Sequence, residues 1–221
     1  MAYVDAVVQG ILLGGLYALF ATGLSLIFGV MRLVNIAHGD FIVLGAYLAL
    51  VVVQATGLHP FASLILVVPL MAGIGYAIQR GLLNRTLGPN LLPPILVTFG
   101  LAVVIQNGLL TLFSTDTRRL AAGPIETASL SLGPISVGWL PLATFAVAVV
   151  LILGLELLFY RTAMGRAFRA TTDDAEMARA MGVNTRHVHA LAMALSFAVI
   201  AIAGVFLAAR SNFDQIGRAH V

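Results

Sequence analysis

A run of hydroxyl and acidic side chains at residues 171–176, Thr-Thr-Asp-Asp-Ala-Glu, is the stretch of this sequence best equipped for polar chemistry. Hydroxyl and carboxylate oxygens accept hydrogen bonds from the free N–H groups at a helix start, and Thr171 and Asp174 have the spacing of a capping box. The pattern predicts a helix that passes through residues 177–181 and ends at Gly182, the position after the C-cap where glycine is favoured.

This helix of about nine residues is too short to be stable alone in water, so it must pack against another surface. Ala175, Ala178 and Ala180 are small enough to allow close approach. Met177 and Met181 supply adaptable apolar contacts. Two interpretations remain open from these residues alone: the helix rests on the lipid surface, or it docks onto protein.

A second polar group, Asn35, His38, Gly39 and Asp40, separates two long apolar segments. Polar groups at membrane depth are costly and often functional. An acid before an apolar run is equally typical of a helix N-cap, and we expect Asp40 to have that structural role. His38 has no partner at ligand spacing, because Asp40 two residues later would face away on a helix. We therefore expect no metal site.

Thr98, Gln106 and Asn107 interrupt a later apolar segment. We expect the adjacent amides to form hydrogen bonds with a neighbouring helix, and a place on a substrate path is the alternative. Glu156 lies a little over one turn before Arg161, near the end of another apolar segment, where it can reach the membrane interface.

The elements that must position these side chains are long apolar segments. No charged residue lies between Asp5 and Arg32, and this run exceeds the roughly 20 residues that a helix needs to cross a bilayer. The chain is 60% hydrophobic and only 10% charged, with a mean hydropathy of +1.02. The strict alternation of barrel strands is absent from these segments. The sequence predicts an all-α, polytopic transmembrane helix bundle of about six spans.

The expected spans are bounded by charges, glycines and prolines. Between the fourth and fifth spans, residues 128–134 alternate and then meet Gly133-Pro134, which predicts a short hairpin. In the first span, four small residues at four-residue spacing predict close helix packing: Gly10, Gly14, Ala18 and Thr22. The spans cover residues 6–30, 41–53 (with a start as early as 38), 61–78, 92–113, 140–160 and 188–208.

Arginine placement predicts the orientation. Most arginines lie in the loops 31–40, 79–90 and 161–187, and positive charge collects on the cytoplasmic side of a membrane. The N-terminus is therefore expected outside and the loop 161–187 in the cytoplasm. The net charge of +3 and the pI near 9.8 follow from this orientation, so we expect no nucleic acid partner.

Several classes of chemistry are missing from the sequence. There is no cysteine, so neither disulfides nor thiolate metal sites can form. The sequence has no G-x-x-x-x-G-K-[ST] nucleotide loop, no H-E-x-x-H motif and no G-x-S-x-G nucleophile motif. The chain is therefore not expected to be an enzyme or to bind a cofactor.

Two stretches together resemble the permeases of bacterial branched-chain amino acid ABC transporters. Residues 23–47, GLSLIFGVMRLVNIAHGDFIVLGAY, are similar to the most recognisable segment of that family, which includes Asn35, His38, Gly39 and Asp40. Residues 165–170, followed by 174–184, are similar to its cytoplasmic coupling loop. The order and separation of the two stretches also fit, and the resemblance extends over nearly all of residues 5–215.

The resemblance implies that the loop helix docks into a cytoplasmic ATPase subunit. The family's loop has a Glu-Ala-Ala…Gly core, whereas the matching positions here begin with an aspartate and keep the acid–small pattern only loosely. The residues implied in coupling are Arg169, Asp173, Asp174, Ala175, Glu176, Ala178, Ala180, Met181 and Gly182.

The resemblance implies a permease subunit of the bacterial inner membrane that imports branched-chain amino acids. ATP is used by a separate ATPase subunit, and the other implied partners are a second related permease, an extracytoplasmic substrate-binding protein and membrane lipid. Urea, short amides or other amino acids are alternative substrates within the family. A secondary transporter or channel is the alternative from another class, and the coupling-like loop and the lack of paired intramembrane charges argue against it.

The chain is expected to form one permease domain over residues 1–215. Residues 216–221 resemble the in-frame translation of a sequencing adapter and are expected to be non-native, with a natural polar tail as the alternative. Chains of the resembled family have about eight spans. The resemblance therefore implies a permease that is incomplete at its C-terminus.

Overall fold

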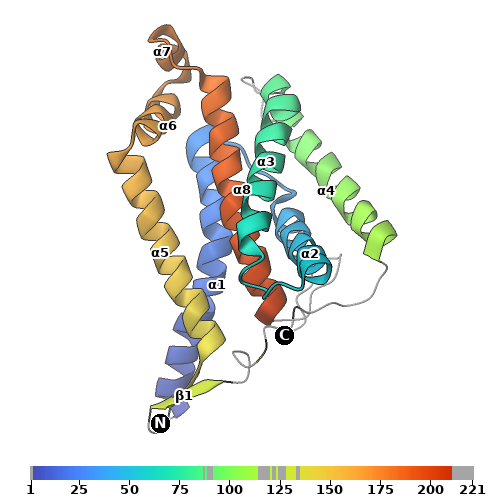
Figure 1. Ribbon diagram of the computed structural model, residues 1–221. Helices are drawn as coiled ribbons and strands as arrows, with labels where there is room; N and C mark the ends of the chain where they lie inside the picture. The colour runs from blue at the N-terminus through green and yellow to red at the C-terminus, as the bar shows by residue number, and fades with distance from the viewer. Residues whose placement is uncertain are drawn as a thin grey trace.

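The computed structural model describes residues 2–86, 88, 92–113, 120, 123, 128–132 and 135–210, and these form a bundle of helices (Figure 1). The expected non-native tail at residues 216–221 lies outside the described residues. The helices are α1 (Ala2–Met31), α2 (His38–Thr56), α3 (Leu64–Gly81), η1 (Leu83–Arg85), α4 (Leu92–Phe113), α5 (Trp139–Arg161), α6 (Ala163–Asp173), α7 (Ala175–Ala180) and α8 (Thr185–Arg210).

Among the described residues, six helices are long and apolar enough to cross a membrane: α1, α2, α3 with η1, α4, α5 and α8. The six expected spans are therefore confirmed. The predicted hairpin is also confirmed, because β1 (Ser129–Leu132) pairs antiparallel with β2 (Ile135–Gly138). The hairpin lies at the same end of the bundle as the N-terminus, and α6 and α7 lie at the opposite end (Figure 1).

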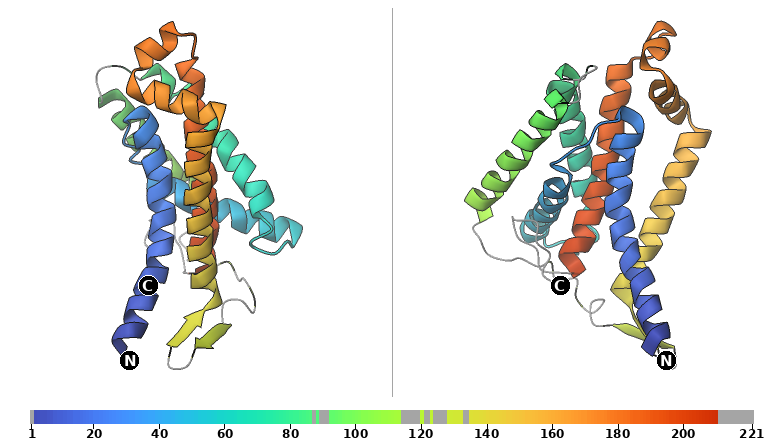
Figure 2. Two further views of the ribbon diagram at one scale, coloured as in Figure 1. Left: turned by 90° about the vertical axis from the view of Figure 1, so that its left-hand side faces the viewer. Right: turned by 180° about the vertical axis from the view of Figure 1, so that it is seen from behind.

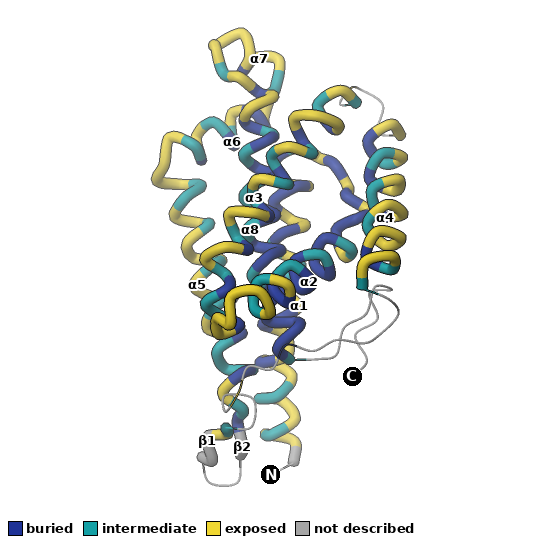
Figure 3. Tube along the Cα trace, turned by 45° about the vertical axis from the view of Figure 1, so that its right-hand side comes forward, coloured by how far each residue is buried: buried dark blue, intermediate teal, exposed yellow. Residues whose placement is uncertain are grey.

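Helix α8 is the central helix of the bundle. In its most apolar stretch 72% of the residues are buried within the chain, against 11% for α5 and 17% for α4. Figure 3 shows the same contrast as a buried centre and exposed outer helices. Small residues let the neighbours of α8 approach: a Cβ on Gly204 would lie 2.6 Å from the carbonyl oxygen of Ile42 in α2. The rest of the described chain therefore leaves most of the surface of α4 and α5 uncovered.

Helix α2 begins inside the bundle and not at its edge. One imidazole nitrogen of His38 lies 3.0 Å from the carbonyl oxygen of Phe20 in α1. At 1.5 Å per residue, Phe20 is roughly 16 Å from the end of α1 at Met31, about half of the hydrocarbon thickness. Arg32, with φ of 52°, reverses the chain, and the segment to Ala37 returns into the bundle (Figure 2). Backbone without helical hydrogen bonds is tolerated at this depth only where protein or water surrounds it.

Within the described chain, no helix packs against the first two positions of the predicted ridge on α1. A Cβ on Gly10 or on Gly14 would meet no atom within 4 Å. The close approaches are at Gly15, whose added Cβ would lie 2.7 Å from the Cα of Phe145 in α5, and at Gly23, whose Cβ would lie 3.1 Å from the His38 ring. Since a helix has 3.6 residues per turn, small residues four apart lie near one face of it. Their spacing does not tell whether another helix covers that face.

Candidate functional site

The coupling-like loop consists of two short helices, α6 and α7, where the sequence predicted one. Asp174 separates them and caps α7: its carboxylate accepts hydrogen bonds from the N–H groups of Glu176 and Met177, both at 2.9 Å. The expected capping box is wrong in one member, because Thr171 lies within α6 and is buried. Two carboxylate bonds hold the start of a helix that has only six residues.

The end of α7 is fixed as the sequence predicted. Gly182 has φ of 88°, a left-handed conformation that glycine adopts without a side-chain clash. Its N–H donates to the carbonyl of Arg179 at 3.0 Å, and the N–H of Val183 donates to the carbonyl of Ala178 at 2.9 Å. This pair of bonds is the Schellman motif, so the predicted role of Gly182 after the C-cap is confirmed.

Helix α7 presents two different faces. Ala178 is 5% exposed and packs inward. Its small size suggested that another surface could approach it closely, but it does not face outward toward a partner. Met177 is 61% exposed and Met181 is 80% exposed. We call the group formed by Glu176, Met177, Ala180 and Met181 the outer surface of α7, and all four residues are exposed.

Helix α6 is attached to the end of α5. Arg169 donates a hydrogen bond to the carbonyl oxygen of Phe159, and its guanidinium lies 5.2 Å from the centre of the Tyr160 ring. Gly165 is buried against the same turn of α5, where an added Cβ would collide with the carbonyl oxygens of residues 158 and 159. Phe168 is fully buried, with its ring 5.2 Å from that of Phe159. Arg169 is thus directed toward the membrane-spanning bundle, and Asp173 is exposed.

The polar residues before α2 anchor the returning segment. The side-chain oxygen of Asn35 accepts from the N–H of Ala37 at 3.1 Å. The hydroxyl of Thr98 in α4 accepts from the N–H of Ile36 at 3.4 Å and donates to the carbonyl of Ile95 at 3.0 Å. The structure therefore brings Thr98 next to the segment 35–40, which contains Asn35, His38, Gly39 and Asp40, although the two are far apart in sequence.

Asp40 is not an N-cap. The N-cap position of α2 is occupied by Ala37, without a capping side chain, and Asp40 lies in the first turn, where it accepts a hydrogen bond from the amide of Gln106 at 2.8 Å. The prediction that Gln106 bonds to a neighbouring helix is confirmed. For Asn107 that prediction is wrong, because its amide donates to the carbonyl of Val103 in its own helix at 2.8 Å. Adjacent residues on a helix point in directions about 100° apart, so only one can face α2.

Removing the bond between Asp40 and Gln106 is expected to loosen α2 from α4. The coupling energy from a double-mutant cycle with Asp40→Ala and Gln106→Ala should be about 0.5–1.5 kcal/mol, the usual size for a hydrogen bond between membrane helices. Denaturant unfolding of the purified protein in detergent measures it. Asn107→Ala is the matched control, and combining it with Asp40→Ala should give strictly additive losses of stability.

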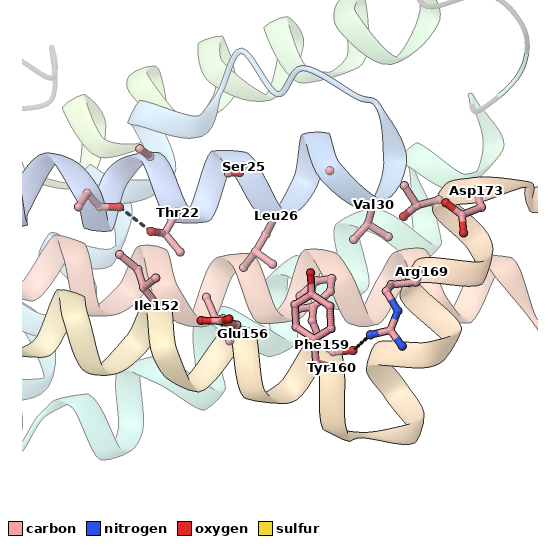
Figure 4. Close-up of a pocket in the computed structure, with 15 residues that line it drawn as sticks. Thr22, Ser25, Leu26, Val30, Ile152, Glu156, Phe159, Tyr160, Arg169 and Asp173 are labelled. Carbon is pink, nitrogen blue, oxygen red and sulfur yellow. Dashed lines mark hydrogen bonds between the residues drawn. The ribbon is translucent and has the colours of Figure 1, made fainter.

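A cavity of about 720 Å³ lies between α1, α5 and α6 (Figure 4). The helices α1 and α5 touch at Gly15 and Phe145 and diverge from there toward α6, as Figure 1 shows. Neither Thr98 nor Gln106 nor Asn107 is among the lining residues. The cavity is lined by Ala18, Ala21, Thr22, Ser25, Leu26, Gly29, Val30, Ile152, Leu155, Glu156, Phe159, Tyr160, Arg169, Thr172 and Asp173.

Sequence reasoning placed Glu156 at the membrane interface and did not connect it with a cavity. The periodicity of α5 could not identify this side, because nearly the whole of α5 is apolar. A signal was nevertheless present: residues 18, 21, 22, 25 and 29 of α1 are all small or hydroxylated and recur at helical spacing.

These features define a polytopic membrane protein with a re-entrant polar segment and a two-helix loop at one end of the bundle. The sequence pattern of the family described as "Branched-chain amino acid transport system / permease component" matches residues 6–218. The chain therefore belongs to this family of membrane permeases.

Individual relatives agree with the family match. The chain is 27% identical over 222 residues to the high-affinity branched-chain amino acid transport system permease protein BraD of Pseudomonas aeruginosa, covering 93% of this chain and 70% of the relative. It is 28% identical over 222 residues to the permease protein LivH of Escherichia coli K12, which is named for the same kind of system, with the same coverage. A shorter match, 30% over 126 residues, covers 55% of this chain and 34% of the autoinducer 2 import system permease protein LsrC of Escherichia coli. No solved structure matches the chain.

Proposed function

We propose that this chain is a permease subunit of an ABC importer that carries branched-chain amino acids across the bacterial inner membrane. A separate cytoplasmic ATPase supplies the energy, and an extracytoplasmic binding protein delivers the substrate. The proposal rests on the family match over residues 6–218 and on the relatives' names. The structural observation that carries it is the outer surface of α7, where two methionines project from a helix that is fixed at both ends.

A surface that receives force from an ATPase must be rigid and must be connected to the spans. The cap at Asp174 and the Schellman motif at Gly182 give α7 defined ends. Arg169 and Phe168 attach α6 to α5, as described above. A displacement of α7 would therefore move α6 and the end of α5 together. Methionine suits such a contact, since its flexible, polarisable side chain adapts to a partner surface.

The exposed spans are consistent with a second permease subunit. α4 and α5 have few buried residues within this chain, and their surfaces are apolar. In a transporter of two related permeases, part of this surface would be covered by the partner and the rest by lipid. Packing contacts and interhelical hydrogen bonds, not hydrophobic collapse, would drive the association.

The proposed orientation places α6 and α7 in the cytoplasm and the N-terminus outside, and it can be tested because residues 1–221 contain no cysteine. In intact cells a membrane-impermeant maleimide is expected to label Tyr3→Cys and to leave Met181→Cys unlabelled. In inside-out vesicles the pattern should reverse. Both positions are highly exposed, at 87% and 80%, so access alone decides the outcome. Labelling of Met181→Cys in intact cells would contradict the orientation.

The dependence on a separate ATPase is tested by deleting its gene in a strain that carries the complete transport system. Uptake of labelled leucine should then fall to the level of a strain that lacks this permease. A secondary transporter or channel would need no ATPase, so uptake that persists after the deletion would overturn the proposal.

The substrate is tested at the binding protein encoded beside the permease gene. Calorimetric titration with leucine, valine and urea is expected to give heat for the two amino acids and none for urea. Heat with urea alone would remove the branched-chain assignment and leave the permease class intact.

A further inference from the structure

The cavity between α1, α5 and α6 contains an unbalanced set of charges. Glu156 and Asp173 are acidic, and Arg169 is the sole basic residue among those that line it. Most of the remaining lining is apolar or small, contributed by α1 and α5. A cavity filled only by lipid tails would gain nothing from these charges, since a carboxylate is costly in hydrocarbon. The lining instead suits a small molecule with both a charged end and an apolar body.

Glu156 of α5 and Arg169 of α6 supply an acidic and a basic side chain to the same cavity. The Arg169 guanidinium is held by its hydrogen bond to the carbonyl oxygen of Phe159, a residue three positions after Glu156 and about 4.5 Å further along the axis of α5. The bond to Phe159 uses one of several N–H donors of the guanidinium, so others can bind a carboxylate. In Figure 4 Glu156, Tyr160 and Arg169 lie along one side of the cavity, with Thr22, Ser25 and Leu26 of α1 opposite.

We propose that this cavity holds the transported amino acid on its way to the cytoplasm, with the ammonium group at Glu156 and the carboxylate at Arg169. This inference rests on the proposed function and adds to it a site within this chain. The aliphatic side chain would lie against Leu26, Val30 and Ile152, the branched residues of the lining. A volume of about 720 Å³ leaves room for water around such a substrate.

The position of the cavity gives it a connection to the ATPase. Arg169, Thr172 and Asp173 belong to α6, so the coupling loop forms one wall of the cavity. The opposite end closes where Gly15 meets Phe145. A movement of α6 would therefore change the wall that binds the carboxylate and leave the closed end in place. Release of the substrate is thereby tied to the displacement of α7.

The test uses cysteine accessibility in the complete transporter, assembled with its ATPase and partner permease in inside-out vesicles. Ser25→Cys faces the cavity, and its neighbour Leu24→Cys is exposed on α1 outside it. A cationic, membrane-impermeant methanethiosulfonate reagent reacts with thiolates, which form in water and not in lipid. We expect Ser25→Cys to react at least about tenfold faster than Leu24→Cys, and saturating leucine to slow the reaction severalfold.

The role of Glu156 is tested in the same vesicles. Glu156→Gln in the Ser25→Cys background should abolish protection by leucine, whereas Glu156→Asp should retain part of it. Equal reaction rates at residues 24 and 25 would overturn the proposal, since the cavity would then hold lipid or another helix. Fast reaction at residue 25 without leucine protection would also overturn it. If either of these results is found while ATP-dependent leucine uptake is normal, the cavity is not the substrate site, but the chain is still a leucine permease. If ATP-dependent leucine uptake is absent, the proposed function itself is wrong.

Discussion

Replacing Gly204 by leucine is expected to prevent the bundle from assembling. A Cβ at this position would lie 2.6 Å from the carbonyl oxygen of Ile42 and 2.9 Å from the backbone nitrogen of Ala46. Both atoms belong to the backbone of α2, so no side-chain rotation can relieve the overlap. Overpacking of a core costs typically 1–3 kcal/mol, and a rigid backbone neighbour places this change at or above the upper end.

The measurement is the yield of monodisperse protein in mild detergent, followed by its thermal unfolding. Gly100→Leu is the matched control, because a Cβ there meets nothing within 4 Å. The control is expected to match the wild-type protein or exceed it slightly, since leucine favours a helix more than glycine does. Equal yields and equal unfolding temperatures for the two variants would show that α2 and α8 do not cross at Gly204.

Replacing both Met177 and Met181 by aspartate is expected to abolish coupling while the protein still folds. Both side chains are mostly exposed on the outer surface of α7, so the bundle loses little buried contact. A few anchor residues carry most of the energy of a protein interface, at more than about 1 kcal/mol each, and the two methionines are the large apolar side chains exposed on the outer surface of α7. A loss of 3 kcal/mol or so corresponds to a fall in affinity of roughly a hundredfold.

Leucine uptake and co-purification of the ATPase are the two measurements for this double variant. Both should fall at least tenfold, with unchanged amounts of permease in the membrane. The control pair Met177→Leu and Met181→Leu keeps the apolar surface and should retain most activity. Normal ATPase retention by the aspartate variant would exclude α7 as the docking element.

Two other substitutions in the loop act differently. Ala178→Trp would force a large side chain into a position that is 5% exposed and is therefore expected to disrupt the loop itself. Gly182→Pro would require φ near −65° where the backbone has +88°, so it should break the helix end. Neither change reports on docking alone, which is why the two exposed methionines are the sharper probes.

The spans were predictable because charges and helix breakers bound each apolar run. Gly182 was predictable for a similar local reason, since its place after an acid-capped helix requires a left-handed residue. The starting depth of α2 was not predictable from hydropathy, because a run of apolar residues gives a length and no depth. It follows from tertiary contacts, the bond between His38 and Phe20 and the bond between Ile36 and Thr98.

The candidate sites were predicted only in part, since a helical pattern does not say which face meets which neighbour. The position of Asp40 before an apolar run predicted an N-cap. In the structure its carboxylate instead accepts a hydrogen bond from Gln106 of α4. Ala178 and Met181 are three residues apart in the sequence, yet one is buried and the other is exposed. The cavity near Glu156 depends on the divergence of α1 from α5, which the contact between Gly15 and Phe145 sets.

The most direct test of the central claim is leucine accumulation in proteoliposomes that contain this permease with its partner permease and ATPase. The binding protein and labelled leucine are supplied on the side of the N-terminus, and ATP on the side of α7. We predict accumulation of leucine against its gradient that requires ATP and stops when the ATPase carries an inactivated nucleotide-binding loop. Accumulation without ATP, or ATP hydrolysis with no movement of leucine, would contradict the account.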